Sequence, residues 1–371
     1  MKVLGVLKEN TGVTVVCLTP NNVASLVKDY TVLVEKGAGD DAGFSDQNYK
    51  DAGAQILDSR NKLINQANII LTHHAHIDES ELNEHKIVIG GYNVLDDFTS
   101  FIQFTNANFD LYSLSLLPRT TIAQSMDILS SLASLSGYQS VVLGLNKLKT
   151  VAPMISGAGG TLPPSNILIL GAGVAGLQAI ATAKRMGAVV YAFDIRKQTK
   201  TEVESLGGKF IQIEGAVEDE NSGGYAVEQG DDFMQKVNST LTKYIKTADL
   251  IITTARIPGK RAPLLINESM FDEIKRGAVV IDLAADTGGN CAYIQPNEEL
   301  IKNDVRLIGN SALYESLPGS ASVLLGNNMT AFLKHYNQCG SPKEDEILQS
   351  TLVVKNGEVV HEKICEEISN Y

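Results

Sequence analysis

The chain has 371 residues, a length typical of two or three domains. Its composition is 44% hydrophobic and 20% charged, as in globular proteins with enough apolar material for a core. The formal net charge of -12 argues against a protein that binds nucleic acid or anionic membranes, because such partners select basic surfaces.

Cysteine usage and hydropathy narrow the class further. The amino-terminal segment lacks the apolar length of a secretory signal, and prolines and glycines interrupt the longest uncharged stretch, 151–183. Neither a C-x-x-C pair nor a spacing typical of metal ligands occurs among the cysteines, which are Cys17, Cys291, Cys339 and Cys365. We therefore expect a chain from a reducing compartment that holds no metal and does not insert into a membrane.

The amino-terminal region alternates short apolar runs with helical patterns. Thr19 and Pro20 are typical of an N-cap and a first helical turn, and they predict a helix that continues to Val27. Strands that alternate with helices form a parallel sheet with helices on both faces. Buried strands are predicted at 3–7, 31–35, 69–72 and 87–89.

A longer helical pattern runs from Thr121 to about Lys147, where apolar residues recur at intervals of three and four. The segment that follows, 155–165, contains glycines and prolines, and we expect it to be a loop near a domain boundary. A second alternation then predicts strands at 166–170, 189–193, 209–213, 249–253, 278–283 and 306–308.

The predicted fold class is therefore α/β, with two doubly wound Rossmann-like domains and a cleft between them. The first domain is expected to be discontinuous, with residues 1–135 and 312–371, and the second domain comprises 136–311. The last predicted element is a hairpin at 351–360, in which Asn356–Gly357 supplies the turn.

The strongest motif lies in the segment ILILGAGVAGLQAIATA at 167–183. Gly171, Gly173 and Gly176, with Val174 among them, form G-x-G-x-x-G after a strand and at the start of a helix. The first glycine permits a tight turn, the second lets the backbone approach a pyrophosphate, and the third allows close helix–strand packing. The helix N-terminus attracts phosphate, so we expect NAD(H) to bind here.

An acidic residue at the end of the next strand supports this prediction. Asp194 follows Gly176 by 18 residues, and an acid there accepts hydrogen bonds from ribose hydroxyls and repels the 2′-phosphate of NADP. Arg196 lies close enough in sequence to weaken that preference. Since one such motif occurs, hydride must pass to a small substrate, which needs a proton donor, or to a nicotinamide brought by a partner, which needs none.

Several segments resemble the proton-translocating NAD(P) transhydrogenases, specifically the NAD(H)-binding domain that begins their alpha subunit and shares its fold with alanine dehydrogenase. The similar segments are 117–142, 171–196, 223–228, 253–266 and 280–291, within a resemblance over nearly the whole chain. It implies the separate first portion of a split alpha subunit, an enzyme of the Si-specific, proton-translocating type. Hydride would pass directly between NAD(H) on this chain and NADP(H) on a partner subunit.

The resemblance also implies roles for single residues. Arg119, Asp127 and Ser130 would hold the nicotinamide carboxamide and ribose, and Gln124 would reach toward the NADP(H) of the partner. Because residues 124, 127 and 130 are three apart, we expect them on one helix face.

Two further segments are similar to cofactor-binding regions of the family. Gly224 and Tyr225 match a mobile loop that closes over NAD(H) and excludes water. Ala255 and Arg256 are expected at a strand end, where open α/β sheets bind cofactors, although relatives usually have an apolar residue in place of Arg256. The residues expected to be catalytic are Arg119, Gln124, Asp127, Ser130 and Tyr225.

The family resemblance implies partners as well. We expect a homodimer, with 151–165 as a contact, and membrane-spanning partners, namely the second portion of the alpha subunit and the beta subunit. Proton movement would occur in those partners. The chain would lie in the cytoplasm, peripheral to the inner membrane.

Two alternative functions compete with this interpretation. In alanine dehydrogenases a substrate arginine, a lysine, a histidine and an aspartate match Val15, Thr72, Gln103 and Asp286 here, so one of four is retained. Amino-acid oxidation needs a carboxylate clamp and a proton acceptor, and it is therefore disfavoured. A non-catalytic NAD(H)-binding regulator would lose the signature at Arg119, which is intact.

Some positions depart from the family or fit no role. Family members often have a proline and an arginine near Tyr314 and Ser316. We interpret the cluster His73, His74 and His76 as a solvated loop and not a metal site. The remaining histidines considered are predicted to be surface positions, namely His335 and His361.

Overall fold

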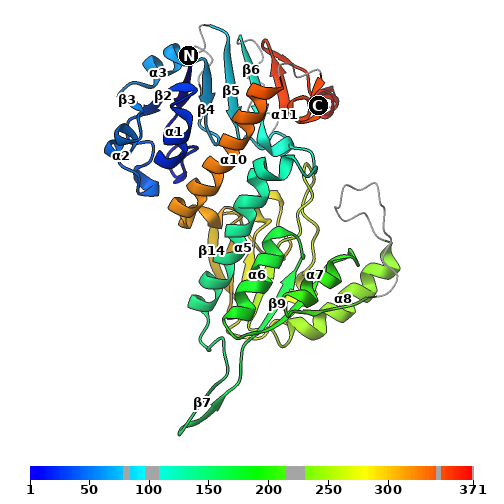
Figure 1. Cartoon of the computed structure of the whole chain (residues 1–371). Helices are drawn as coiled ribbons and strands as arrows, with labels where there is room; N and C mark the ends of the chain where they lie inside the picture. The colour runs from blue at the N-terminus through cyan, green and yellow to red at the C-terminus, as the bar shows by residue number, and fades with distance from the viewer. Residues whose placement is uncertain (78–83, 97–107, 214–229, 340–343, 370–371) are drawn as a thin grey trace. The chain divides into compact units, whose positions relative to one another are not determined.

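The computed structural model describes residues 1–77, 84–96, 108–213, 230–339 and 344–369. The chain divides into two compact units (Figure 1). Unit 1 comprises Met1–Leu132 and Glu315–Tyr371, and unit 2 comprises Ala133–Tyr314. Each unit is built on its own sheet of mainly parallel strands. The expected α/β class with two Rossmann-like units is confirmed.

The sheet of unit 1 has eight strands in the described residues. Their order is β17 (Glu358–Val359), β16 (Leu352–Lys355), β6 (Phe109–Ser113), β5 (Lys86–Gly90), β4 (Ile69–Leu71), β1 (Lys2–Val6), β2 (Tyr30–Glu35) and β3 (Gln55–Leu57). Strands β1 to β6 pair in parallel, whereas β16 is antiparallel to β6. The chain winds outward from β1 in both directions, so the strand order reverses between β1 and β4, the place where doubly wound sheets bind ligands.

Local sequence signals explain the ends of several elements in unit 1. Thr19 accepts a hydrogen bond from the Asn22 N–H, and Pro20 opens α1 (Pro20–Leu26), as predicted. The terminal hairpin is also confirmed, because Asn356 and Gly357 both have positive φ, 49° and 82°, as a type I′ turn requires. The other α-helices of the unit in the described residues are α2 (Asp46–Asp51), α3 (Arg60–Gln66), α10 (Pro318–Gln338), α11 (Glu346–Thr351) and α12 (Glu362–Ser369).

The sheet of unit 2 has seven strands in the described residues. Their order is β11 (Lys209–Phe210), β10 (Val189–Phe193), β9 (Asn166–Leu170), β12 (Leu250–Thr253), β13 (Val279–Asp282), β15 (Val305–Gly309) and β14 (Glu298–Lys302). All pair in parallel except β14. The order reverses between β9 and β12, which defines the binding edge of a Rossmann sheet. The helices described in this unit, besides α5, are α6 (Val174–Arg185), α7 (Thr199–Ser205), α8 (Asp231–Ile245) and α9 (Glu268–Phe271).

The helix expected from Thr121 begins later than predicted. A short 3-10 turn, η4 (Ala123–Met126), precedes α5 (Ile128–Lys147). A Cβ at Gly137 would overlap the carbonyl of Ala175, and one at Gly144 would lie 2.6 Å from Leu250, so α5 packs its backbone against the core of unit 2. Of the helices in the described ranges, α5 alone is long and apolar enough to cross a membrane, judged by length and composition. Its close packing is that of a core helix.

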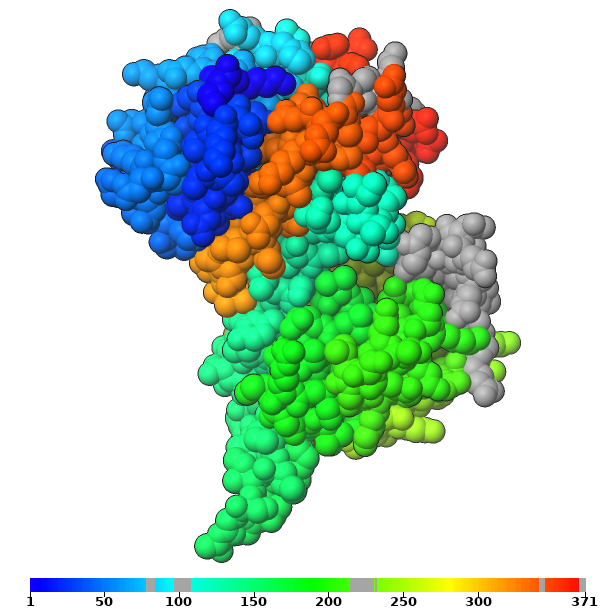
Figure 2. Space-filling model, in the orientation of Figure 1, coloured from blue at the N-terminus to red at the C-terminus, as the bar shows by residue number. Residues whose placement is uncertain are grey.

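The segment expected to be a loop at 155–165 is instead a hairpin. Strands β7 (Ile155–Gly157) and β8 (Gly160–Leu162) pair antiparallel, and all their residues are exposed. The hairpin extends away from the rest of unit 2 as an arm (Figures 1 and 2). The sequence prediction failed because strands without a buried face have no apolar alternation to reveal them.

Candidate dinucleotide site

The glycine motif forms the turn between β9 and α6, and its backbone has the shape that the motif predicts. Gly171 has φ 102°, and a Cβ there would lie 2.6 Å from the Thr254 Oγ1 atom. A Cβ on Gly176 would overlap the carbonyl oxygen of Gly171. Both positions therefore require glycine for packing. By contrast, a Cβ on Gly173 would meet nothing within 4 Å, so the backbone there faces open space into which a ligand can approach.

The N-terminus of α6 lies beside that open space. Gly173 is the N-cap and contributes no side chain, and Val174, the first helical residue, is 44% exposed. The first N–H groups of a helix have no partner within the helix, and they attract anions. The described residues here fit a dinucleotide pyrophosphate.

The acid at the end of β10 is tied to the glycine loop. The Oδ2 atom of Asp194 accepts a hydrogen bond from the Ala172 N–H at 2.7 Å. Arg196 donates from Nε to Oδ1 at 2.9 Å and from Nη2 to Oδ2 at 2.8 Å. The Asp194 side chain is 7% exposed. Its orientation is thus fixed by the residue pair that was predicted to set the preference for NAD(H).

The strand end that carries Ala255 is held by a residue that the sequence interpretation did not assign. The Asn290 side chain donates to the Ala255 carbonyl at 2.8 Å and accepts from the Ala255 N–H at 3.0 Å. Asp282 in turn accepts from the Asn290 N–H at 2.6 Å and from the Cys291 N–H at 3.1 Å. Burial raises the pKa of the Asp282 carboxyl, and these N–H groups oppose that rise. The only sequence signal for this support was the family segment 280–291.

Arg256 forms an ion pair with the aspartate of the DTGG segment. Its Nη1 atom lies 3.1 Å from Asp286 Oδ2, and Ser311 donates to Asp286 Oδ1 at 2.7 Å. Asp286, the one retained position of the alanine dehydrogenase set, therefore belongs to a local polar network within unit 2. Arg256 lies at the strand end predicted for it, directly after β12.

In unit 1 the predicted nicotinamide residues lie on three different local structures. Arg119 is exposed in the segment after the 3-10 turn η3 (Leu114–Leu116), and Gln124 is exposed on η4. Asp127 has extended backbone angles, φ -73° and ψ 93°, and ends η4. It accepts from the Ser130 N–H at 2.9 Å and from the Ser130 hydroxyl at 2.6 Å. The structure therefore brings Asp127 and Ser130 together.

The prediction that Gln124, Asp127 and Ser130 share one helix face is wrong. Asp127 acts as an N-cap for α5, and an N-cap residue leaves the helical conformation to receive the N–H of the first turn. The chain therefore changes direction between Gln124 and Ser130. Gly224 and Tyr225, the predicted closing loop, lie outside the described residues.

The binding edge of the sheet in unit 1 holds a buried carboxylate. Glu9 accepts from the Thr72 hydroxyl at 2.9 Å, from the His73 N–H at 2.6 Å and from the His74 N–H at 3.0 Å. Burial raises the pKa of the Glu9 carboxyl. The Val15 side chain is buried in the same unit. Thr72 and Val15, where alanine dehydrogenases carry a lysine and an arginine, thus belong to the interior here. Gln103 lies outside the described residues.

Two histidine predictions are wrong in physical detail. His73 is 3% exposed and His74 is half-buried, so the cluster is no solvated loop. The cause is Glu9, whose carboxylate binds the backbone of both residues and draws the segment inward. His335 was expected on the surface, but its side chain is 14% exposed and lies beside Asp345.

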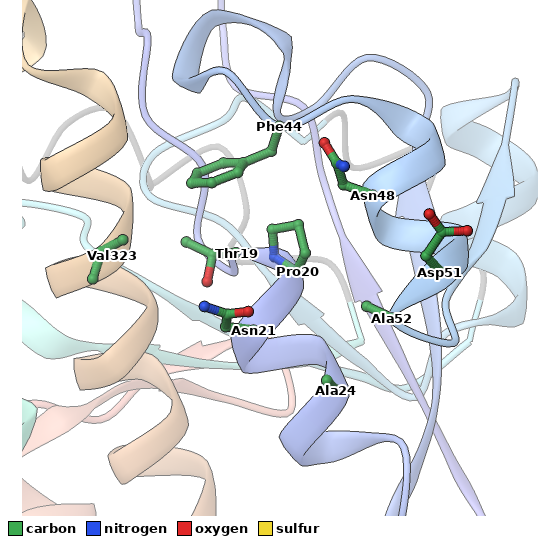
Figure 3. Close-up of a pocket in the computed structure, with 9 residues that line it drawn as sticks. All are labelled: Thr19, Pro20, Asn21, Ala24, Phe44, Asn48, Asp51, Ala52 and Val323. Atoms are coloured by element: carbon green, nitrogen blue, oxygen red, sulfur yellow. The ribbon is translucent and has the colours of Figure 1, made fainter.

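Unit 1 also contains an open hollow of about 470 Å³. The side chains around it come from α1, α2 and α10 and from the loop that carries Phe44 (Figure 3). None of the predicted site residues lines it, so it gives no support to a cofactor site. The lining residues are Thr19, Pro20, Asn21, Ala24, Phe44, Asn48, Asp51, Ala52 and Val323.

The sequence matches two family models in succession. Residues 5–136 match the N-terminal domain of alanine dehydrogenase/PNT, and residues 140–362 match the C-terminal domain.

Individual relatives agree with these models. The chain is 39% identical to the separately encoded first portion of NAD(P) transhydrogenase subunit alpha from Rhodospirillum rubrum over 361 residues, which are 93% of this chain and 94% of that protein. It is 33% identical to the crystal structure of transhydrogenase from Sinorhizobium meliloti, with a TM-score of 0.87 over 97% of this chain and 100% of that one. A structure of L-alanine dehydrogenase shares the fold, with 22% identity and a TM-score of 0.82 over 100% of this chain and 99% of that one.

Proposed function

Because the chain belongs to the alanine dehydrogenase/PNT family, we propose that it is the NAD(H)-binding component of a proton-translocating NAD(P) transhydrogenase. It passes hydride directly between NAD(H) on this chain and NADP(H) on a partner subunit. The similarity to the first portion of a transhydrogenase alpha subunit over nearly its full length supports this proposal over other members of the family.

The observation that carries the cofactor proposal is the glycine loop with its tethered acid in unit 2. Gly171 and Gly176 are required by packing, Gly173 faces open space, and Asp194 is fixed by the Ala172 N–H. We propose that the loop and the N-terminus of α6 hold the pyrophosphate, and that Asp194 binds the adenosine ribose. When bound, the cofactor supplies the hydride at its nicotinamide ring.

The remaining predicted residues keep their proposed roles. Arg119, Asp127 and Ser130 orient the nicotinamide carboxamide and ribose, and Gln124 reaches toward the partner's NADP(H). The Asp127–Ser130 hydrogen bond supports a joint action, because it fixes the rotamers of both side chains. Gly224 and Tyr225 are proposed to close over the cofactor and exclude water, and Ala255 and Arg256 are proposed to contact it.

The interior of unit 1 favours direct transfer over amino-acid oxidation. Oxidation of alanine needs a cation that grips the carboxylate and a group that takes a proton. At the matching positions Val15 is buried and the Thr72 hydroxyl is bound to Glu9. Hydride transfer between two nicotinamide rings needs neither group.

We also propose the partners that this function requires. The chain docks on membrane-spanning transhydrogenase subunits, the second portion of alpha and the beta subunit, at the cytoplasmic face of the inner membrane, and proton movement occurs in them. It forms a homodimer through the β7–β8 arm. Support for the dimer comes from the exposed apolar side chains of the arm, Met154 at 64%, Ile155 at 47% and Leu162 at 53%, since a projecting apolar surface typically marks an interaction site.

A substrate panel tests the proposed function. The purified chain is mixed with NADPH and an NAD analogue, with and without the NADP(H)-binding domain of a related transhydrogenase. In parallel it receives NADH with pyruvate and ammonia. We expect reduction of the analogue only when the partner domain is present. Oxidation of NADH by pyruvate and ammonia, without transfer to the analogue, would assign the chain to the amino-acid dehydrogenases instead.

A further inference from the structure

Three side chains of different chemistry converge where α10 meets α11 in unit 1. His335 lies in the last turn of α10, Cys339 is the residue at its C-terminal end, and Asp345 is the N-cap of α11. The Nε2 atom of His335 lies 2.9 Å from Asp345 Oδ1 and 3.0 Å from Oδ2. The Cys339 sulfur lies 3.4 Å from that nitrogen and 3.3 Å from Asp345 Oδ2.

These separations are close to those of three ligands on one tetrahedral ion. With Zn–S near 2.3 Å and Zn–N and Zn–O near 2.0–2.1 Å, a tetrahedron places its S, N and O ligands about 3.3–3.6 Å apart. The ligand types also agree, since thiolate, imidazole and carboxylate are the protein ligands of Zn²⁺. We propose that His335, Cys339 and Asp345 form a zinc site with water as the fourth ligand.

The local fold holds the three ligands in place before the ion binds. His335 and Cys339 are four residues apart, so they share a face of the helix end. Asp345 is oriented by the Leu348 N–H, which donates to Oδ1 at 2.9 Å. The Oδ2 atom faces Cys339 and is the oxygen that would bind the ion.

The surroundings allow a metal to enter and a water to complete the site. The side chains of His335 and Asp345 are 14% and 20% exposed, so the cluster is neither sealed in the core nor open on every side. On binding, the Cys339 thiol loses its proton to solvent, and the imidazole binds through neutral Nε2. No oxidation or reduction occurs.

The site differs in place and purpose from the proposed hydride transfer. It joins the end of α10 to the start of α11, which leads directly into β16 at the edge of the sheet. The ion would therefore clamp the C-terminal segment onto unit 1. Hydrogen bonds alone could also hold these side chains together, as an N-cap with two neighbours. A metal titration distinguishes the two arrangements.

The experiment uses the full chain and Co²⁺ alone as a spectroscopic substitute for Zn²⁺. We expect about one Co²⁺ per chain, with visible bands of tetrahedral geometry and a thiolate-to-cobalt band. Cys339→Ser should abolish the thiolate band, and His335→Gln should weaken binding at least about tenfold, as loss of one ligand does for metal sites. Asp345→Asn should also weaken binding while keeping the N-cap, because asparagine caps helices as well as aspartate does.

A matched thiol serves as the control. Cys365, also in unit 1, donates to the Val359 carbonyl at 3.4 Å, and Cys365→Ser should leave the cobalt spectrum unchanged. Zinc should raise the melting temperature of the parent chain and of this control but not that of Cys339→Ser. The proposal is overturned if the parent chain shows no thiolate band, or if that band persists in Cys339→Ser. Failure of hydride transfer would leave it unaffected.

Discussion

Arg196 grips the carboxylate of Asp194 through two parallel hydrogen bonds, from Nε at 2.9 Å and from Nη2 at 2.8 Å. An acid at this position prefers NAD(H), because it binds the ribose hydroxyls and repels a 2′-phosphate. A guanidinium beside it supplies the group that accommodates that phosphate. The structure resolves this apparent conflict, since the Ala172 N–H also holds Asp194 and keeps the acid in the loop.

The first prediction concerns this pair. Asp194→Ala should weaken NADH binding about 10–150-fold, the loss expected for hydrogen bonds to a charged group, and should narrow the preference over NADPH. Arg196→Ala should keep the preference for NADH, because Asp194 retains the Ala172 N–H. Fluorescence titration of both cofactors measures the Kd values. An equal loss of NADH affinity in both variants would show that the acid does not select the cofactor.

The second prediction separates two glycines of one motif. Gly176→Ala should destabilise unit 2 by about 1–3 kcal/mol or more, because the new methyl group overlaps the Gly171 carbonyl. Gly173→Ala meets open space and should leave the melting temperature unchanged while it weakens NADH binding. Thermal unfolding and cofactor titration are measured on both proteins. A Gly173→Ala protein that binds NADH like the parent would show that the pyrophosphate lies elsewhere.

The third prediction tests the role of Arg119. Arg119→Ala should lower hydride transfer to a partner domain about 10–150-fold, if its charged hydrogen bonds act on the nicotinamide. The melting temperature should not change, because Arg119 is exposed. Ser125→Ala is the matched control, since Ser125 is exposed on η4 and its hydroxyl donates to the Ile122 carbonyl. Undiminished transfer by Arg119→Ala and by Gln124→Ala would overturn the proposed nicotinamide contacts.

The fourth prediction concerns pH. Burial lowers the pKa of His74 from 6.5 to about 4. Between these values the unfolded chain binds the proton and the folded chain does not, so His74 reduces stability as the pH falls from 6.5 to 4. Glu9, whose pKa burial raises, acts in the opposite direction and is common to parent and variant.

The comparison with His74→Asn isolates the histidine. On acidification from pH 7.5 to pH 5 the parent should lose more of its melting temperature than the variant loses. Denaturation scans at several pH values measure the difference. Parallel curves for the two proteins would mean that His74 keeps its ordinary pKa in the folded chain.

The fifth prediction concerns the β7–β8 arm. Ile155→Asp combined with Leu162→Asp should convert the proposed dimer into monomers, because charges replace exposed apolar contacts. Ile301→Asp is the control, since Ile301 is 62% exposed on β14 of the same unit. Light scattering after size exclusion gives the mass. A monomeric parent chain, or a dimer that survives both arm substitutions, would refute the arm as the dimer contact.

The dinucleotide loop was predictable because its chemistry is local. Glycines, a strand, a helix start and an acid occur at fixed spacing, and the structure places Asp194 directly after β10 as expected. The strands of both sheets were also found in outline, since buried parallel strands are continuous apolar runs. β14 was missed because its residues are largely exposed.

Other features depend on contacts between distant residues. Asn290 supports Ala255 from 35 positions away, and Glu9 draws in His73 from 64 positions away, so no local pattern announces either. The break at Asp127 was missed because a polar residue within an apolar repeat suits a helix surface as well as an N-cap. The cluster of His335, Cys339 and Asp345 combines three residue types at a spacing that matches no common metal motif.

Deuterium tracing tests the central claim of direct hydride transfer most directly. The chain is combined with an NADP(H)-binding partner domain, NAD⁺ and NADPH that carries deuterium at the transferred C4 position. Direct transfer predicts NADH that carries that deuterium in full, and no deuterium in NADH when the unlabelled reaction runs in deuterated water. Label lost to solvent, or transfer that proceeds without the partner domain, would contradict it.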